Sequence, residues 1–481
     1  MRIHLIGICG TAMSALASML KKKGIEVQGS DVNAYPPVST LLKDNGIPIL
    51  KGFDGRNVDN GLDLVVVGNV ARRDNPEVLA AVGMNIPLVS MPQAIRRFFL
   101  QDRFSVVAAG THGKTTVTSM TSWLLQFAGE EPSYLVGGVP LNFGSNFRIG
   151  EGRHFVIEGD EYDTAFFDKK AKFFHYNPSV AVITSLEFDH ADIYRDFDHL
   201  KETFSEFAGT VNPQGTLVYC ADYPVLEEIV AGASAKTVSY GFSREADWKI
   251  ANVRSDPQGT SYELTVRGGI VGTVTVPMWG NHNVLNSVAA LAAARYAGVP
   301  LETAIKGIGF FDGVMRRFQT VGKEWGVTVL DDFAHHPTAV RETVLATKTR
   351  FPDARIFAAY HFESNTSRRK VFEKEYSTAF FGADFVFLTY PLIKKDGMKA
   401  DEYLNPHAVL AGIKGYANDA QAYKDMRIMA AGVAEMLEPG DVVIAMSGRD
   451  FTPFYETLLP MLKRRSSPRA VRTTAPGLPA L

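Results

Sequence analysis

The chain has 481 residues with 50 basic and 52 acidic side chains, which gives a formal net charge of −2. The length favours roughly three domains, and the balanced charge argues against the basic face with which nucleic-acid-binding proteins displace counterions. Cys9 and Cys220 lie far apart and outside any Cys-x-x-Cys pattern, which argues against a disulfide framework or a zinc site and fits a reducing cytoplasm. No apolar stretch reaches the length of a membrane span, so we expect no membrane insertion; the oligomeric state stays open.

The first hundred residues alternate between short apolar strands and helical segments, a pattern that predicts a parallel, doubly wound sheet. The predicted strands cover residues 2–8, 26–31, 47–50, 62–68 and 87–90. After the first strand, the turn Gly7-x-x-Gly10 is a shortened dinucleotide fingerprint, and Asp31 follows about where a ribose-binding acid belongs. Either this is a tight strand–helix turn with a solvated aspartate, or it binds the diphosphate of a nucleotide-linked substrate.

A second α/β region begins near residue 103 with a predicted strand over 104–109. Residues 110–116 then read Gly-Thr-His-Gly-Lys-Thr-Thr. The glycines let backbone N–H groups face phosphate oxygens, Lys114 supplies charge for the outer phosphates, and Thr115 can ligate Mg²⁺. Ala108 stands where the common P-loop has a glycine, so the match is to a shortened loop. With a strand before it and an apolar helix pattern after it, the loop predicts a site for a nucleoside triphosphate.

Acidic side chains follow two more predicted strands of this region, 155–158 and 180–184. The residues concerned are Glu158, Asp160, Glu161 and Asp163 at the first, and Asp189, His190 and Asp192 at the second. Sheets of this class bind ligands at the carboxyl ends of their strands, and crowded carboxylates favour a cation such as Mg²⁺. The alternative at each strand end is a solvated acidic loop.

Three polar motifs lie further along the chain. Asn283 and Asn286 share one face of a predicted alanine-rich helix over 283–298, where they could cap the helix or contact the nucleotide. Arg317, in the run Arg-Arg-Phe after a predicted hinge, offers a charged fork for phosphate. Asp332 belongs to an Asp-Asp-Phe-Ala-His-His-Pro run that ends another predicted strand. Each of the last two motifs could also be surface charge.

The rest of the chain completes an α/β organisation. Residues 245–277 predict a small β-rich insertion beside the main sheet, and 464–481 predict a disordered tail. A third α/β region has a predicted helix over 337–350 and strands over 327–331, 355–359, 385–388 and 442–446. We therefore expect domains over 1–102, 103–313 and 314–463, followed by the tail.

Taken together, the motifs resemble those of the Mur ligases, ATP-dependent amide-bond ligases that build the bacterial cell-wall peptide. The resemblance covers about residues 1–463 and rests on the ordered motifs 110–116, 158–163, 187–190, 281–286, 316–318 and 331–337. It implies an N-terminal Rossmann-like sheet, a central P-loop ATPase-type α/β domain and a C-terminal Rossmann-like α/β domain. It also implies ATP and Mg²⁺ as cofactors and a location in the bacterial cytoplasm.

The resemblance implies roles for individual residues. The catalytic residues would be Lys114, His190 and Arg317. The Mg²⁺ ligands would be Thr115, Glu158 and His190. The residues that bind ATP would be Gly110, Thr111, His112, Gly113, Lys114, Thr115, Thr116, Asn283, Asn286, Arg317 and Asp332. The UDP-sugar would bind at Gly7, Gly10, Thr11, Ala12, Met13 and Asp31, and the peptide at His335, Asn365 and Arg368.

Within the family, residues 137–144 and 158–169 most resemble the recycling branch. That branch joins UDP-N-acetylmuramate to the tripeptide L-alanyl-γ-D-glutamyl-meso-diaminopimelate through an acyl phosphate, so the expected partners are these small molecules and ATP. Two departures stand out. Ser205 or Glu206 occupies the place of a carbamylated lysine in several relatives, so we expect no carbamate. Glu363 precedes Ser-Asn-Thr where the recycling enzymes have an arginine, which leaves the peptide assignment insecure.

Three other interpretations remain open from the sequence. The ligase that adds L-alanine to the same nucleotide sugar shares nearly every motif. A non-catalytic nucleotide sensor or scaffold could keep the fold, although the intact Lys114, Glu158 and His190 argue against it. A dehydrogenase built on the first domain is weakened by the incomplete glycine fingerprint.

Overall fold

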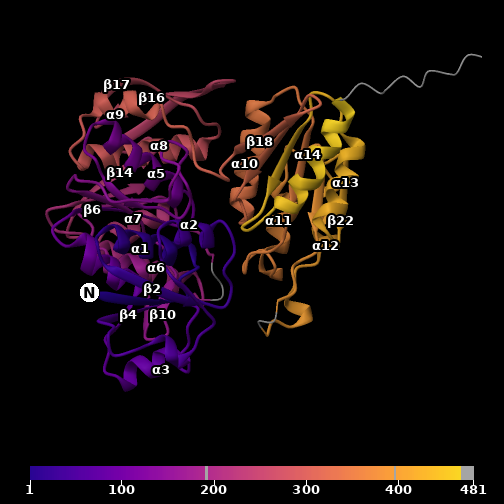
Figure 1. Ribbon diagram of the computed structural model, residues 1–481. Coiled ribbons are helices and arrows are strands. Elements are labelled where there is room, and N and C mark those ends of the chain that lie inside the picture. The colour runs from indigo at the N-terminus through magenta and orange to yellow at the C-terminus, as the bar shows by residue number, and fades with distance from the viewer. Residues whose placement is uncertain (190–192, 395–396, 467–481) are drawn as a thin grey trace, which may run out of the picture. The chain divides into compact units, whose positions relative to one another are not determined.

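The computed structural model describes residues 1–189, 193–394 and 397–466. The chain divides into a first compact unit, Met1–Met315, and a second that begins at Arg316; each is described by itself (Figure 1). The first unit contains an N-terminal sheet, a larger central sheet and a small hairpin, and the second unit contains one sheet. Helices flank all three large sheets, which confirms the α/β class (Figure 1).

The N-terminal sheet is entirely parallel, with the strand order β3-β2-β1-β4-β5. Its strands are β1 (Arg2–Ile6), β2 (Glu26–Asp31), β3 (Ile49–Lys51), β4 (Leu64–Val67) and β5 (Leu88–Ser90). Its helices are α1 (Thr11–Lys22), α2 (Val38–Asp44), α3 (Pro76–Gly83) and α4 (Met91–Ile95). The predicted doubly wound sheet is therefore confirmed, because strands of apolar residues alternate with helical crossovers.

The central sheet has the order β17-β16-β15-β14-β13-β12-β6-β9-β7-β8. Its strands are β6 (Phe104–Ala109), β7 (Ser133–Leu135), β8 (Phe147–Arg148), β9 (His154–Glu158), β12 (Val180–Ile183), β13 (Thr216–Cys220), β14 (Lys236–Gly241), β15 (Trp248–Asp256), β16 (Gly259–Val266) and β17 (Gly269–Val276). Its helices are α5 (Lys114–Phe127), α6 (Phe197–Gly209), α7 (Pro224–Val230), α8 (Asn281–Tyr296) and α9 (Leu301–Ile308). The predicted β-rich insertion is not separate from the main sheet, because β15 pairs with β14 and continues it.

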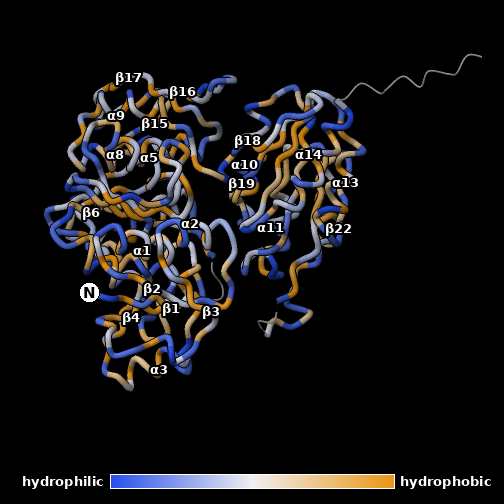
Figure 2. Tube along the Cα trace, viewed as in Figure 1, coloured by the Kyte–Doolittle hydropathy of each residue, from blue (hydrophilic) through white to orange (hydrophobic). Residues whose placement is uncertain are grey.

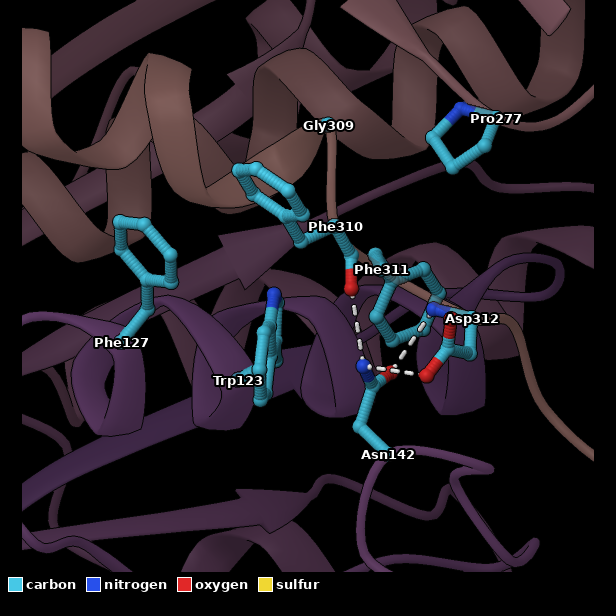
Figure 3. A pocket seen from close by; sticks show the side chains of 8 residues that line it. All are labelled: Trp123, Phe127, Asn142, Pro277, Gly309, Phe310, Phe311 and Asp312. Atoms are coloured by element: carbon cyan, nitrogen blue, oxygen red, sulfur yellow. Dashed lines mark hydrogen bonds between the residues drawn. The ribbon is translucent and has the colours of Figure 1, made fainter. Parts of the chain in front are cut away.

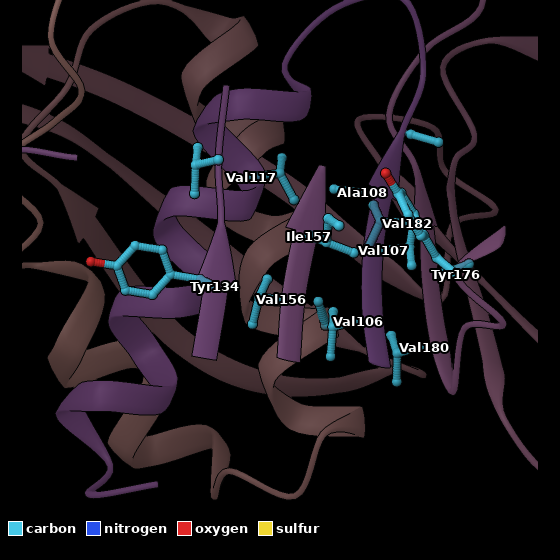
Figure 4. Close-up of a cluster of buried hydrophobic side chains, with 14 of the residues drawn as sticks. Val106, Val107, Ala108, Val117, Tyr134, Val156, Ile157, Tyr176, Val180 and Val182 are labelled. Carbon is cyan, nitrogen blue, oxygen red and sulfur yellow. The ribbon is translucent and has the colours of Figure 1, made fainter. Parts of the chain in front are cut away.

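The core of the central sheet consists of β-branched and aromatic side chains from its middle strands. Figure 4 shows Val106 and Val107 of β6 beside Val156 and Ile157 of β9, with Val180 of β12 alongside. These strands carry near-continuous apolar runs because helices cover both faces of a parallel sheet. The hydrophobic colour in Figure 2 likewise follows the interior strands, while blue lies on the outer loops.

Replacing one aromatic side chain of this core is expected to destabilise the protein strongly. Phe173 is fully buried, with its ring centroid 4.4 Å from that of Phe207 and 5.4 Å from that of Phe204. Phe173→Ala should lower the free energy of unfolding by about 3–5 kcal/mol, measured by urea denaturation followed by circular dichroism. The exposed Phe167 is the matched control, and Phe167→Ala should cost less than about 1 kcal/mol. Equal losses would contradict this placement of the core.

A hairpin from the central region packs against the N-terminal sheet. It consists of β10 (Asp163–Ala165) and β11 (Asp168–Ala171), and Ala165 lies in a buried cluster with residues of β1 and β4. Asp163 accepts a hydrogen bond from the Asn69 side chain at 3.2 Å, and the buried Asp168 accepts one from Ser90 at 2.9 Å. The chain segment that carries the acidic motif is thus fixed to the N-terminal sheet.

His154 at the start of β9 is expected to make the free energy of unfolding depend on pH. Its buried ring lies 2.8 Å from the Ala297 carbonyl through Nε2, and burial lowers its pKa below the ordinary value of 6.5. Below pH 6.5 the unfolded chain binds more protons at this site than the native chain, so stability falls as the pH falls toward the lowered pKa. His154→Gln keeps an N–H for the carbonyl but cannot titrate. Thermal unfolding of this variant should therefore depend less on pH between 7 and 5, and identical pH profiles would contradict the assignment.

The second unit contains one sheet with the order β18-β19-β23-β20-β21-β22, parallel except for the antiparallel edge strand β18. Its strands are β18 (Gln319–Glu324), β19 (Val327–Asp332), β20 (Ile356–Tyr360), β21 (Phe385–Thr389), β22 (Asp419–Tyr423) and β23 (Val442–Met446). Its helices are α10 (Pro337–Arg350), α11 (Glu373–Ala379), α12 (Pro406–Ile413), α13 (Met426–Met436) and α14 (Thr452–Ser466). Helix α14 extends into the stretch predicted as a tail, whose residues from 467 lie outside the described part of the chain.

Candidate active site

The glycine loop connects β6 to α5, as its sequence predicts. Gly113 has a φ of 82°, and a Cβ at this position would collide with the Asn286 side chain of α8. On the other side of the loop, the Thr184 hydroxyl donates to the His112 carbonyl at 2.5 Å. Only glycine tolerates both the left-handed backbone and the close packing at position 113. The loop is therefore held between β12 and α8 with its N–H groups at the start of a helix.

Lys114 at the beginning of α5 is held in a network of oxygen atoms. Its Nζ donates to the Gly110 carbonyl at 2.6 Å and lies 2.8 Å from a carboxylate oxygen of the buried Glu161. Burial opposes the charge on this lysine, but Glu161 and the neighbouring Asp160 outweigh burial and raise its pKa. The lysine therefore carries a full positive charge at neutral pH in a poorly solvated position.

Glu158 at the end of β9 is held beside the first helical turn. The Thr115 hydroxyl lies 3.0 Å from both of its carboxylate oxygens, and the Gly137 N–H donates to one of them at 2.8 Å. Burial raises the pKa of Glu158 above its ordinary value, although Lys114 partly opposes that shift. Loss of solvent without a full counter-charge is the environment in which a carboxylate gains most from a cation.

The pKa of Asp160 shifts in the opposite direction to that of Glu158. Burial disfavours its charge, but an ion pair with Lys172 and the proximity of Lys114 lower its pKa to about 2. One residue further on, the Glu161 carbonyl accepts a hydrogen bond from the Tyr194 hydroxyl at 2.7 Å. The acidic motif is thus an ordered structure with defined partners, and the alternative of a solvated acidic loop is wrong here.

The residues around the loop fit a nucleotide with Mg²⁺. A hydroxyl and a carboxylate, Thr115 and Glu158, present adjacent oxygen atoms, which is the donor chemistry that Mg²⁺ prefers. His190, the third predicted ligand, lies outside the described residues. The adjacent Asp189 is buried, and Glu187 lies 3.0 Å from His112 through its carboxylate. Glu187 also exchanges two hydrogen bonds with Thr111, so the second acidic strand end contacts the glycine loop directly.

The other predicted nucleotide residues of the first unit differ in their surroundings. Thr116 is buried on α5, and Asn286 lies against Gly113 as described above. Asn283 is also buried, and its side chain donates to the Trp279 carbonyl at 2.9 Å. Gly280 is the N-cap of α8 and no side chain among the described residues caps this helix, so the interpretation of Asn283 and Asn286 as helix caps is wrong. A contact between Asn283 and adenine remains a prediction.

The N-terminal turn orients Asp31 toward the start of α1. One Asp31 carboxylate oxygen accepts the Cys9 N–H at 2.9 Å, and Gly7 turns with a φ of 79°. Gly10 precedes the first turn of α1, where Thr11 is exposed, Ala12 is partly exposed and Met13 is buried. Uncapped N–H groups at the start of this helix and a fixed acid beside it suit a nucleotide diphosphate and its ribose.

In the second unit, Arg317 belongs to a tight turn before β18. Its guanidinium lies 4.9 Å from the centre of the Phe333 ring, a cation–π distance. Asp332 is buried and its carboxylate accepts the backbone N–H groups of Phe318 and Ala334, both at 2.7 Å. Burial raises the pKa of Asp332, while the charge of Arg317 opposes the shift. Ribose contact by Asp332 remains a prediction.

The predicted peptide residues lie near the carboxyl ends of β19 and β20. The His335 carbonyl accepts hydrogen bonds from the Tyr360 and Tyr376 hydroxyls, and Asn365 is exposed. Arg368 is only 1% exposed, and its guanidinium donates to the Leu392 carbonyl at 3.3 Å. In this geometry Arg368 supports the loop from inside, so direct peptide contact by Arg368 would require the loop to rearrange.

A separate open pocket of about 610 Å³ lies at the far end of α5 (Figure 3). Trp123 and Phe127 of α5 line it together with Phe310, and the Asn142 side chain is hydrogen-bonded to the Phe310 carbonyl and to Asp312. Lys114 and Phe127 are at opposite ends of the helix, about 20 Å apart at 1.5 Å per residue. This pocket is therefore not the nucleotide site.

Sequence reasoning missed two groups that complete the candidate site. Lys172, the partner of Asp160, carries no motif and lies nine residues after Asp163. Gly137, whose N–H binds Glu158, belongs to a loop between β7 and β8. The four carboxylates of the acidic motif outnumber the single positive charge of Lys114, so the sequence could have suggested that a further cation lies nearby. Only the fold shows that Lys172 supplies it.

Three family domains match the chain in order. Residues 2–103 match the Mur ligase family catalytic domain, 108–294 the Mur ligase middle domain, and 316–449 the Mur ligase glutamate ligase domain. Together they cover most of the chain, and their order corresponds to the three large sheets.

Relatives align over nearly the whole length. A UDP-N-acetylmuramate–L-alanyl-γ-D-glutamyl-meso-2,6-diaminoheptandioate ligase of Escherichia coli is 37% identical, over 97% of this chain and 99% of that protein. A UDP-N-acetylmuramate–L-alanine ligase of Salinibacter ruber is 34% identical, over 96% of this chain and 95% of that protein. The crystal structure of a murein peptide ligase from Psychrobacter arcticus is 31% identical with a TM-score of 0.72, over 96% of this chain and 99% of that one.

Proposed function

Because the chain belongs to the Mur ligase family, we propose that it joins UDP-N-acetylmuramate to the tripeptide L-alanyl-γ-D-glutamyl-meso-diaminopimelate. Members of this family are ATP-dependent ligases that form amide bonds, so the chain is an enzyme that uses ATP and Mg²⁺. The observation that carries the tripeptide assignment is the 37% identity, over 97% of the chain, to a relative whose name states that reaction. This membership argues against both a dehydrogenase and a non-catalytic scaffold.

The reaction requires activation of a carboxylate. The lactyl carboxylate of UDP-N-acetylmuramate attacks the γ-phosphorus of ATP, the bond from that phosphorus to the bridging oxygen breaks, and ADP leaves. The product is an acyl phosphate. The amino group of the peptide then attacks the acyl carbon, loses a proton and expels inorganic phosphate. The protein contributes mainly position and charge, because the carboxylate, the transferred phosphoryl group and both leaving groups are anionic.

Residues of the first unit support the nucleotide end of this reaction. Lys114 would neutralise the β- and γ-phosphates. Its buried positive charge is paired with Glu161 in the ligand-free protein, and a phosphate oxygen would replace that carboxylate as its partner. Thr115 and Glu158, with His190, would hold Mg²⁺, which supplies charge neutralisation for the transferring phosphoryl group when bound. Gly110, Thr111, His112, Gly113 and Thr116 would form the phosphate loop, and Asn286 would support it.

Other residues would bind the remaining groups. Arg317 would contact the γ-phosphate, Asp332 the ribose and Asn283 the adenine. The turn from Gly7 to Met13 with Asp31 would bind the UDP moiety, and His335 and Asn365 would contact the peptide. We propose domain boundaries at 1–102, 103–313 and 314–463. We also propose a cytoplasmic location, because ATP and nucleotide sugars are cytoplasmic metabolites; among the described residues no helix is long and apolar enough to cross a bilayer.

A substrate comparison tests the proposal. The purified protein is given Mg²⁺, ATP and UDP-N-acetylmuramate with either the tripeptide or L-alanine, and phosphate release is measured. The expected result is rapid release with the tripeptide and release near background with L-alanine. Turnover with L-alanine alone would replace the tripeptide assignment by the L-alanine ligase, which the 34% identical Salinibacter ruber relative supports as the second candidate.

A further inference from the structure

The Arg-Arg-Phe turn of the second unit has an unusual backbone. Arg316 has a φ of 58° and Phe318 a φ of 52°, so both non-glycine residues on either side of Arg317 are in the left-handed region. Such conformations are energetically unfavourable for non-glycine residues and persist only where surrounding contacts determine them. The contacts that hold this turn therefore determine where the Arg317 side chain lies.

Arg316 makes most of those contacts through its guanidinium. Its Nε lies 3.2 Å from a carboxylate oxygen of the buried Asp331, and its Nη2 donates to the Ser447 carbonyl at 3.0 Å and to the Arg449 carbonyl. Its backbone carbonyl accepts the Phe333 N–H at 2.7 Å. A guanidinium has five N–H donors in a rigid planar fork, and this fork fits three acceptors in different directions better than the compact ammonium of a lysine does.

The two arginines of the turn thus have different environments. Both guanidinium groups lie over the Phe333 ring, Arg316 at 5.3 Å and Arg317 at 4.9 Å from its centre. Arg316 is in addition bound to β19 and to the loop after β23. On the other side of Arg317, Asp332 accepts the Phe318 N–H at 2.7 Å. Adjacent carboxylates of β19 therefore hold the residues before and after Arg317.

We propose that Arg316 is a positioning residue, anchored by Asp331 and by the loop after β23, whose function is to fix Arg317 for the terminal phosphate of ATP. This inference rests on one part of the proposed function, namely that Arg317 contacts the terminal phosphate of ATP. It does not depend on which amine the enzyme uses. Removal of Arg316 should consequently reproduce part of the loss caused by removal of Arg317, and should add nothing when Arg317 is absent.

Nucleotide binding to the full chain tests this division of roles. The dissociation constants of ADP and of a non-hydrolysable ATP analogue are measured by calorimetry with Mg²⁺, and their ratio reports recognition of the γ-phosphate. Arg317→Ala should reduce the preference for the analogue about tenfold, and Arg316→Gln about threefold or more. The double variant should match Arg317→Ala within about twofold, because coupled residues are not additive. Arg316→Lys should retain an intermediate preference.

The control removes an equivalent ion pair elsewhere in the same sheet. Arg355 binds the buried Asp441 at 2.6 Å at the opposite end of β20, so Arg355→Gln tests the effect of losing a comparable pair. It should leave the nucleotide ratio unchanged. An unchanged ratio in Arg316→Gln, or a further loss in the double variant, would overturn the proposal. A failure of the tripeptide assignment would appear only in phosphate release and not in these binding constants.

Discussion

Lys114→Met is expected to reduce ATP-dependent ligation by about 10³-fold or more, because it removes the buried positive charge that we propose faces the phosphates. The Lys114 side chain is 13% exposed and its partner Glu161 only 2%, so water cannot replace the lost charge. The substitution should also destabilise the ligand-free protein, since it leaves Glu161 buried without its cation. Phosphate release and thermal unfolding measure the two effects separately.

A second substitution separates folding from chemistry in this experiment. Lys114→Met combined with Glu161→Gln removes both charges of the pair, so stability should return toward that of the wild type. Activity should stay near background, because the phosphates still lack their cation. Lys169, which is 67% exposed and paired with Asp163, provides the matched control: Lys169→Met should keep activity within about twofold. Recovery of activity in the double variant would show that Lys114 acts only through structure.

Glu158→Gln is expected to have opposite effects on activity and on stability. The variant should lose activity by a factor on the order of 10² or more and need much higher Mg²⁺, because an amide is a weaker ligand than a carboxylate. The native pKa of Glu158 is raised by burial, so the native state holds its proton more tightly than the unfolded state. Stability of the ligand-free protein consequently falls as the pH rises from 4.5 through the raised pKa. A neutral glutamine should therefore make the ligand-free protein at least as stable as the wild type above that pKa.

Asp160, two residues away, is the contrasting control. Its pKa is lowered to about 2, so its charge stabilises the native state above the ordinary value of 3.8, and that contribution is lost as the pH falls toward 2. Asp160→Asn should therefore destabilise the protein at neutral pH, whereas Glu158→Gln should not. Thermal unfolding at pH 7 without Mg²⁺ compares the two variants directly. Equal destabilisation by both would contradict the electrostatic difference between these neighbouring acids.

The sequence predicts strands, turns and the glycine loop well, because these features depend on residues that are close together in the chain. Apolar runs followed by glycine turns identify β1 and β6, and the loop before α5 has the structure that its residues predict. The fold class and family follow from the same motifs. These features depend on residues close together in the chain, which is why spacing and residue type are enough to predict them.

Other features depend on pairing between distant segments and could not be read from the sequence. Nothing in residue order shows that Lys172 neutralises Asp160 or that β15 continues the main sheet. The run Arg-Arg-Phe likewise presents two similar arginines. Only the contact of Arg316 with Asp331 shows that the first arginine is held by the sheet, and similarly the burial of Arg368 becomes visible only in the folded loop.

The hairpin β10–β11 has a consequence for exchanging parts between related ligases. It follows the acidic motif in the chain, yet Ala165 completes the apolar interior of the N-terminal sheet, and Asp168 holds Ser90. A fragment ending near residue 102 would leave that interior open and Ser90 without its acceptor. Chimeras that graft the N-terminal sheet onto another family member should therefore carry residues 163–171 from the same parent, although these residues lie beyond the domain boundary. The N-terminal sheet and the hairpin that packs against it therefore form one structural unit that is discontinuous in sequence.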